Sequence, residues 1–410
     1  VYGAKALKKV LFNTFSEIQD ERPKIATKAG LLYSYQPYSE TNAEDFMTNT
    51  IVKKEFYDNR NDEIKDRCSV PVFRLTPHQY LLSNFMSPDT KYMSLLLFHG
   101  TGTGKTCTSI SIAENFKDSV DEYGRIIVIC GKSLKDNFYT NLFDIDKIGE
   151  EDQDSQCIGS VYYDLLNDDE KSKTKHLQHN AIKRKINEFY NISTYFTFAK
   201  NLSDEKYNRG KIPQNKNEYS LPKEISDEKA KMKPTEYRAM IEKKYSNRVI
   251  IVDEVQSLRD EDNSEFDFKL ITEILMDIAL HSRNTRMILL SATPMYNEPG
   301  EIEWLINVMR VNDNKSPIEP NKVFTENGDL TEEGGDILAK YSRGYISYVT
   351  NDDPINFPLR LYPDVYNDPL SRYNVLSTNH RDFFNGKDLI SKNNFNKLKL
   401  FYPNPWTVKD

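Results

Sequence analysis

The chain has 410 residues, a length that predicts two to three folding units at roughly 150 residues each. Hydrophobic residues make up 38% and aromatic residues 12% of the sequence, enough to build a core, so a disordered chain is excluded. Every apolar run is far shorter than the ~18 residues of a membrane span, and we expect neither a transmembrane segment nor a membrane partner. The 55 basic and 62 acidic residues give a net charge of −7, so a polyanion would need a local basic patch.

The four cysteines lie far apart in the sequence and form no Cys-x-x-Cys pair; they are Cys68, Cys107, Cys130 and Cys157. This spacing argues against a zinc site and against a disulfide scaffold. We therefore expect buried, reduced cysteines in a cytoplasmic protein that is not secreted.

Residues 1–70 are mixed and polar, and they predict an N-terminal extension with a helix near Ala4 to Ile18. Between residues 71 and 312, short β-rich runs alternate with amphipathic segments, which predicts an α/β domain with a mostly parallel central sheet flanked by helices. Four of the five predicted strands are nearly continuous in apolar residues, as strands covered on both faces are. The five are Ser94–His99, Arg125–Cys130, Tyr195–Ala199, Arg248–Asp253 and Met287–Ser291.

The segments between and after these strands predict helices and insertions. A helix is expected directly after the first strand, and the last helix of the domain carries Ile302, Leu305, Ile306 and Met309 at helical spacing. Residues 149–185 and 201–247 are charged and weakly patterned, so we expect surface insertions without a core of their own. Residues 313–410 are interpreted as a connector or the start of a further domain.

The strongest functional signal follows the first predicted strand and reads His99-Gly100-Thr101-Gly102-Thr103-Gly104-Lys105-Thr106. A glycine-rich loop between a buried strand and a helix lets backbone N–H groups wrap a phosphate chain, and the positive end of the helix dipole faces the same anion. Lys105 is expected to reach the β- and γ-phosphates, and the Thr106 hydroxyl to bind Mg²⁺. The first position of this motif is usually Gly or Ala, whereas here it is His99. The alternative is an ordinary glycine loop with a solvated lysine.

An acidic pair, Asp253 and Glu254, ends the predicted strand Arg248–Asp253. The pair emerges at the carboxyl edge of the sheet, where ligands bind in α/β folds. Asp253 is suited to hold Mg²⁺ through water, and Glu254 to orient and deprotonate an attacking water. Alone, such a pair is more simply a solvated strand end or a helix cap. The phosphate loop upstream favours the catalytic interpretation.

A third motif, Ser291-Ala292-Thr293, ends the last predicted strand and puts two hydroxyls near the same edge. By itself it is a strand-to-turn transition. The three motifs together occur in the order and spacing of the first motor domain of superfamily 2 helicases and translocases. Thr76-Pro77-His78-Gln79-Tyr80, upstream of the loop, resembles the adenine-reading segment of that superfamily.

Within the superfamily, the sequence is most similar to the Swi/Snf-like helicases of large cytoplasmic DNA viruses. This group includes poxvirus nucleoside triphosphatase I and the small subunit of the poxvirus early transcription factor. Two further segments resemble the stretch that these viral proteins carry after their first motor domain, namely Gly344–Val349 and Asp352–Pro358.

The resemblance implies a RecA-like domain that binds ATP with Mg²⁺ and couples its hydrolysis to movement on DNA, with RNA as the alternative substrate. It implies that Gln79 contacts the base, that Gln256 couples the γ-phosphate to a partner domain, and that Ser291 and Thr293 relay nucleotide state to the nucleic-acid groove. It also implies a role in viral transcription, with viral RNA polymerase or other transcription subunits as partners, in the viral factory or the virion.

One feature of the family is missing after Thr293: no Gln-x-x-Gly-Arg-x-x-Arg pattern follows, so we expect a second RecA-like domain to be absent. Since an arginine finger is worth about 10³ to 10⁵ in rate, this chain alone should bind ATP and hydrolyse it weakly. Two functions stay open, a DNA helicase or translocase subunit and a nucleotide-gated transcription-factor or scaffold subunit of a viral RNA polymerase complex. A kinase or GTPase shares only the phosphate loop, and no Asn-Lys-x-Asp guanine reader is present.

Nucleic-acid contacts are predicted after the second strand, where the sequence reads Gly131-Lys132-Ser133-Leu134-Lys135. The Ser133 hydroxyl and the ammonium groups of Lys132 and Lys135 would bind a backbone phosphate without reading bases. The alternative for both lysines is a solvated first helical turn. Phe196 and Phe198, in the third predicted strand, are candidates with core packing as the alternative.

Overall fold

The computed structural model describes residues 53, 56, 75–119, 124–150, 153–154, 156–206, 233–259, 268–295, 299–319, 321–325 and 328–349. The predicted N-terminal helix near Ala4 to Ile18 and the segment Asp352–Pro358 lie outside these residues. All of the described residues fall in one compact unit, Val1–Val349.

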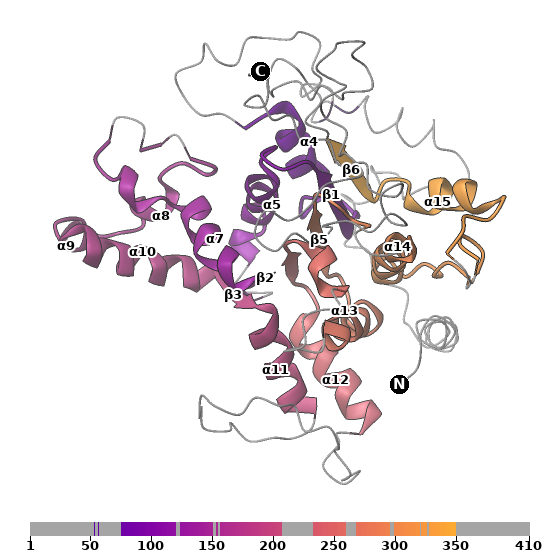
Figure 1. Ribbon diagram of the computed structural model, residues 1–410. Coiled ribbons are helices and arrows are strands. Elements are labelled where there is room, and N and C mark those ends of the chain that lie inside the picture. Colours follow the sequence, from indigo (N-terminus) through magenta and orange to yellow (C-terminus); the bar gives the residue numbers. More distant parts are fainter. Residues whose placement is uncertain are drawn as a thin grey trace, which may run out of the picture. The chain divides into compact units, whose positions relative to one another are not determined.

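The centre of this unit is a six-stranded parallel sheet with the strand order β3-β2-β4-β5-β1-β6 (Figure 1). The strands are β1 (Ser94–His99), β2 (Ile126–Cys130), β3 (Tyr190–Thr194), β4 (Val249–Val252), β5 (Arg286–Ser291) and β6 (Ile346–Val349). Four of them, β1, β2, β4 and β5, are buried along almost their whole length. Their continuous apolar runs produce this burial because both faces of the sheet are covered. The predicted α/β class and these four strands are confirmed.

Helices cover the sheet in two layers (Figure 1). On one face α4 (Pro77–Phe85), α5 (Lys105–Glu114) and α7 (Lys135–Leu142) pack together. On the other lie α11 (Tyr195–Lys206), α12 (Pro234–Tyr245), α13 (Phe268–His281) and α14 (Gly300–Asn312), with α15 (Gly334–Ser342) against α14. The helices predicted after the first strand and at the end of the domain are therefore confirmed as α5 and α14. None of the helices in the described part of the chain combines the length and the apolar character needed to cross a bilayer.

The predicted third strand, Tyr195–Ala199, is wrong. The strand lies one segment earlier, at Tyr190–Thr194, and residues 195–199 form the first turns of α11. The Thr194 hydroxyl accepts a hydrogen bond from the Thr197 backbone N–H at 3.2 Å, which caps the start of that helix. Because β3 is an edge strand with only Tyr190 and Ile192 buried, its apolar signal is weaker than that of the aromatic run that follows it.

The sheet also continues past residue 312, where the sequence placed the end of the domain. Strand β6 lies at the outer edge and pairs in parallel with β1, so Ile346–Val349 belong to the sheet rather than to a connector. Three of its residues are half-buried and Tyr348 is exposed, and a short edge strand of this kind gives no continuous apolar run to recognise.

The cysteines also differ from the prediction. Cys107 in α5 and Cys157 in the following insertion form a disulfide, with their Cα atoms 5.4 Å apart. Cys130 is free and buried, as expected. The two bonded cysteines are 50 residues apart in the sequence, and only the packing of the insertion against α5 brings them together.

Candidate active site

The predicted motifs meet at the carboxyl edge of the sheet. Strand β5 lies between β1 and β4, and the register pairs Phe98 with Ser291 and Val252 with Leu289. Since all strands run parallel, the loop after β1, the acid after β4 and the hydroxyl motif at the end of β5 leave the sheet on the same side. The proximity on which the sequence interpretation depends is therefore present.

The phosphate loop, residues 100–104, has the backbone that its glycines predict. Gly102 and Gly104 have φ values of 79° and 82°, in the left-handed region that other residues rarely adopt. A Cβ atom on Gly104 would lie 2.8 Å from the Gln79 Nε2 atom, so this position accepts only glycine without rearrangement. The Thr103 hydroxyl donates to the Gly100 carbonyl at 2.7 Å and closes the turn. Helix α5 then begins at Lys105, and the N–H groups of its first turn face the loop. This cradle fits a phosphate chain.

Lys105 and Asp253 lie close enough for their charges to interact. Lys105 is only 9% exposed and Asp253 6%. Burial, together with the nearby Glu254 carboxylate, raises the pKa of Asp253 to about 6, while the Glu254 backbone N–H and the Lys105 ammonium act in the opposite direction. Bringing a cation to this carboxylate would offset the cost of its burial. Thr106, the other predicted metal ligand, is half-buried in the first turn of α5.

A chain of hydrogen bonds joins the predicted base to the hydroxyl motif. The Gln256 Nε2 atom donates to the Glu254 carboxylate at 2.6 Å, and the Ser291 hydroxyl donates to the Gln256 Oε1 atom at 2.7 Å. The Thr293 backbone N–H in turn donates to the Ser291 hydroxyl oxygen at 3.0 Å. Four of the five residues predicted for catalysis and coupling after β4 and at the end of β5 are thus in one network.

Tyr195 is a site residue that the sequence interpretation missed. Its hydroxyl donates to the backbone carbonyl of Asp253 and also contacts that of Glu254, at 3.2 Å. Glu254 has a φ of 51°, an unfavourable conformation for a residue with a side chain. Burial and the neighbouring Asp253 carboxylate raise the pKa of Tyr195, so its hydroxyl stays a donor. The sequence interpretation placed Tyr195 in a predicted strand, and that placement did not indicate a contact with the residues after β4.

Gln79, the predicted base-contacting residue, is buried beside the phosphate loop at 3% exposure. Its Oε1 atom accepts from the Thr76 backbone N–H at 2.8 Å, and its Nε2 atom donates to the Gly104 carbonyl at 3.3 Å. The side chain therefore connects the N-terminus of α4 to the end of the loop. A contact with adenine stays a prediction.

The predicted nucleic-acid residues lie after β2 on the same edge. Lys132 and Ser133 are exposed in a short 3-10 helix, η4 (Lys132–Leu134), and Lys135 starts α7. The two aromatic candidates separate: Phe198 is buried in the core, whereas Phe196 is 39% exposed in the first turn of α11. For Phe198 the core interpretation is correct.

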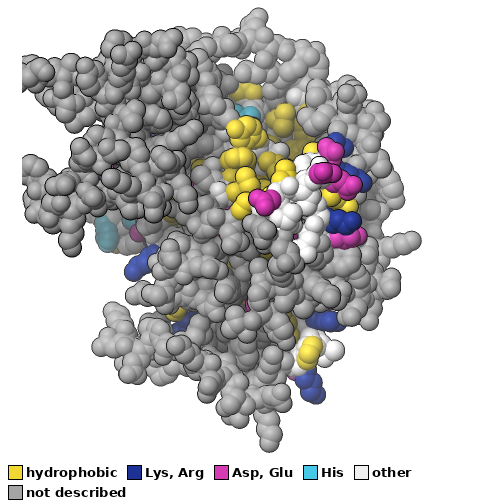
Figure 2. Space-filling view, turned by 45° about the vertical axis from the view of Figure 1, so that its right-hand side comes forward, with side chains coloured by type: hydrophobic (Ala, Val, Ile, Leu, Met, Phe, Trp, Pro, Cys, Tyr) yellow, Lys and Arg dark blue, Asp and Glu magenta, His cyan; other side chains and the backbone are white. Residues whose placement is uncertain are grey.

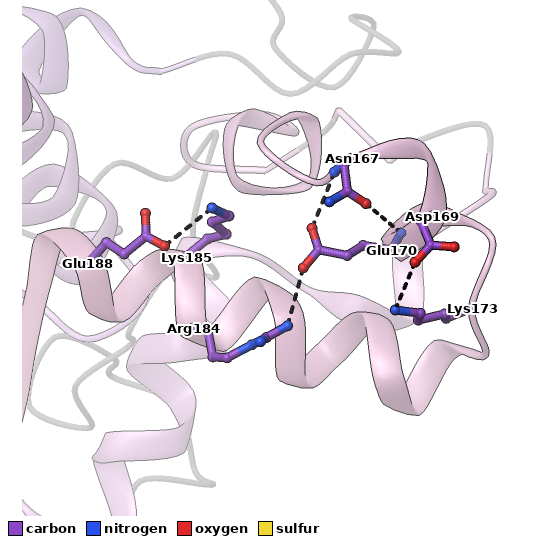
Figure 3. Close-up of polar contacts among 7 residues, drawn as sticks. All are labelled: Asn167, Asp169, Glu170, Lys173, Arg184, Lys185 and Glu188. Atoms are coloured by element: carbon purple, nitrogen blue, oxygen red, sulfur yellow. Dashed lines mark hydrogen bonds and ion pairs between the residues drawn. The ribbon is translucent and has the colours of Figure 1, made fainter.

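Other charged regions are balanced rather than basic. In the insertion, α10 (Lys175–Phe189) packs against β3, and α8 (Val161–Asp164) and α9 (Asp168–Lys171) pack against α10 (Figure 1). Cations there pair with acids, as Figure 3 shows for Arg184 with Glu170 at 3.2 Å and Lys173 with Asp169 at 3.3 Å. On the face seen in Figure 2, acidic and basic side chains of the described residues are interspersed beside hydrophobic ones. Neither region is therefore a better candidate for binding a polyanion than the sheet edge after β2.

The sheet order and the site define a RecA-like P-loop fold, with the phosphate loop after β1, the acid after β4, and β5 between them. Residues 78–333 match the SNF2-related domain, and the chain belongs to this family. This confirms the Swi/Snf-like resemblance that the motifs indicated.

Two viral relatives illustrate the similarity. "Putative ATP-dependent RNA helicase L377" of Acanthamoeba polyphaga mimivirus is 31% identical over 379 residues, 86% of this chain and 30% of the relative. "Putative helicase 009L" of Frog virus 3 (isolate Goorha) is 31% identical over 274 residues, 66% of this chain and 23% of the relative. The chain thus spans less than a third of either relative. The solved Sulfolobus solfataricus SWI2/SNF2 ATPase core in complex with dsDNA aligns at 16% identity and a TM-score of 0.38, over 68% of this chain and 45% of that one, too weakly to add to the argument.

Proposed function

We propose that this chain is the ATP-binding motor domain of a viral nucleic-acid translocase or helicase and that it hydrolyses ATP. The observation that carries the proposal is the network from Glu254 through Gln256 to Ser291, next to the phosphate loop. A protein that only binds phosphate requires no hydrogen bonds from a general base after β4 to the end of the neighbouring strand β5. In a motor such a link is expected, because hydrolysis at the nucleotide must change the conformation of other parts of the protein.

Each group has a role that its position supports. Lys105 and the N–H groups at the start of α5 bind the β- and γ-phosphates. Thr106 and Asp253 would hold Mg²⁺, which would neutralise charge on the phosphates when bound. Glu254 orients the attacking water and accepts its proton. Gln256 and Ser291 change their hydrogen bonds when the γ-phosphate leaves.

DNA is the proposed track, bound through its backbone at the edge formed by Lys132, Ser133 and Lys135. The viral relatives are named as helicases, three of them as RNA helicases of mimivirus, so RNA is the alternative substrate that the assay must distinguish from DNA. We extend the proposal to a role in viral transcription, with RNA polymerase subunits as partners and the viral factory or virion as location. Only the family resemblance supports this last step.

The test measures ATP binding and single-turnover ATP hydrolysis by the chain, without nucleic acid and with duplex DNA, single-stranded DNA or RNA. Lys105→Ala should lose ATP binding, whereas Glu254→Gln should keep binding and lose hydrolysis by about 10²-fold or more. Lys132→Ala with Lys135→Ala should weaken DNA binding uniformly across sequences and leave ATP binding intact.

The expected rate is low, since a second domain would supply the arginine finger. Hydrolysis that is identical with and without every nucleic acid would contradict the motor proposal. If Lys105→Ala and Glu254→Gln variants also retained a stable complex with viral RNA polymerase, the scaffold function would replace it.

A further inference from the structure

Both ends of the phosphate loop are held by residues outside the loop. At its start, the Gly100 backbone N–H donates to the Val349 carbonyl of β6 at 2.9 Å. At its end, the Gly104 carbonyl accepts from the Gln79 side chain of α4 at 3.3 Å. The loop is therefore positioned from two sides, by the edge strand and by the helix before β1.

Strand β6 contacts the end of β1 on both faces of the sheet. The register pairs Phe98 with Tyr348 and His99 with Val349. On one face, the rings of Phe98 and Tyr348 lie 4.8 Å apart between centroids. On the other, His99 is the diagonal neighbour of Ser347, and its Nε2 atom lies 2.9 Å from the Ser347 hydroxyl. The bond to Gly100 continues this ladder by one residue into the loop.

His99 occupies the position where this motif usually has a small residue. Its side chain is fully buried, and its ring lies in a T-shaped arrangement with the His78 ring of α4, with the ring centroids 5.7 Å apart. Burial, followed by the charges of His78 and Lys105, lowers the pKa of His99 to about 3, so the ring is neutral in ordinary buffers. Within the described residues its Nδ1 atom has no hydrogen-bond partner. The tautomer that leaves a lone pair rather than an N–H group unpaired costs less, so Nε2–H donates to Ser347.

We propose that His99 is a positioning residue of the phosphate loop, which ties the loop's first glycine to Ser347 of β6 and so makes the affinity for ATP depend on that edge strand. The proposal rests on the proposed function of the loop as the ATP site. It also explains why His99 can stand where the motif usually has Gly or Ala. The imidazole fills the space between α4 and β6 that a smaller residue would leave open.

The test is calorimetric titration of the 410-residue chain with Mg²⁺-ATP, well below the unfolding temperature. His99→Ala and Ser347→Ala should each weaken ATP binding about fivefold, the loss expected for one hydrogen bond that supports the binding geometry. His99→Gln, whose amide Nε2 can donate in place of the imidazole, should restore the affinity to within about twofold. The double variant should be no weaker than His99→Ala, because both changes remove the same bond. Ser342→Ala, at the end of α15, is the matched serine control.

The outcomes separate the two proposals. If the wild-type chain and Lys105→Ala bind ATP equally poorly, the proposed function fails. If the wild-type chain binds ATP, and His99→Ala and Ser347→Ala bind it unchanged, the positioning role is refuted. A lower unfolding temperature with unchanged ATP affinity means that the contact is only structural and also refutes it. Should His99→Ala fail to fold, the half-buried Ser347→Ala still decides the question.

Discussion

The hydroxyl of Tyr195 offers the sharpest single-atom test of the site. Tyr195→Phe keeps the ring in place and removes only the donor that contacts the Asp253 and Glu254 carbonyls. The net hydrogen bond is worth about 1 kcal/mol, and leaving buried carbonyls unpaired adds about as much again, so the free energy of unfolding should fall by about 2 kcal/mol. Urea unfolding measures this part independently of any activity.

The same substitution should affect turnover more than ATP binding. Glu254 holds a left-handed backbone that costs about 1–2 kcal/mol, and the Tyr195 hydroxyl is a contact that stabilises that bend. Without it the bend can relax and move the Glu254 carboxylate away from the position that suits the attacking water. We expect single-turnover ATP hydrolysis to fall by about tenfold, the equivalent of 1.4 kcal/mol, with ATP affinity within about twofold of wild type.

Tyr237→Phe is the matched control. The Tyr237 hydroxyl donates to the Asp277 carboxylate at 2.8 Å, between α12 and α13, so its loss should lower stability by a similar amount and leave hydrolysis unchanged. Equal hydrolysis by Tyr195→Phe and wild type would refute the reasoning. So would an equal slowing by Tyr237→Phe, because stability alone would then explain the effect.

Three further predictions concern the loop and its helix. Cys107→Ser or Cys157→Ser should lower the unfolding free energy by up to about 4 kcal/mol in oxidising buffer, given the 50-residue loop, and a reducing agent should abolish the difference from wild type. In the unfolded chain His99 has its ordinary pKa of 6.5, whereas in the folded chain its pKa is about 3. The free energy of unfolding should therefore be highest above pH 6.5 and about 2 kcal/mol lower at pH 5, because the unfolded chain is then protonated at His99 and the folded chain is not. His99→Gln should remove this pH dependence, which urea unfolding measures. Gly104→Ala, with φ at 82°, should cost about 1–2 kcal/mol and weaken ATP binding, whereas Gly335→Ala, which meets nothing within 4 Å, should do neither.

The sequence was informative where burial and chemistry coincide. Strands β1, β2, β4 and β5 are apolar on both faces, and the motifs at their carboxyl ends could be placed because parallel strands bring those ends to one edge. The edge strands were not recognised in this way. With one neighbour each, β3 and β6 need fewer apolar residues, and the signal that remains in β3 is the N-cap at Thr194.

Contacts between distant segments could not be read from local patterns. The bond from Tyr195 to Asp253 spans 58 residues, and that from His99 to Ser347 spans 248. The disulfide depends in the same way on how the insertion folds against α5. Residue types with a fixed chemical task could be proposed from the sequence, whereas residues that hold others in place, such as Tyr195, were recognised only once the fold was known.

The pairing of β6 with β1 matters for anyone who shortens this chain. A fragment that stops at residue 312, the boundary suggested by the motifs, would remove β6 and leave the Leu95–Phe98 stretch of β1 as an unpaired, apolar border of the sheet. Such borders recruit strands from other molecules and promote aggregation. Fragments intended for biochemistry should therefore extend at least to Val349, and poor solubility of shorter ones would not mean that the SNF2-related domain itself fails to fold.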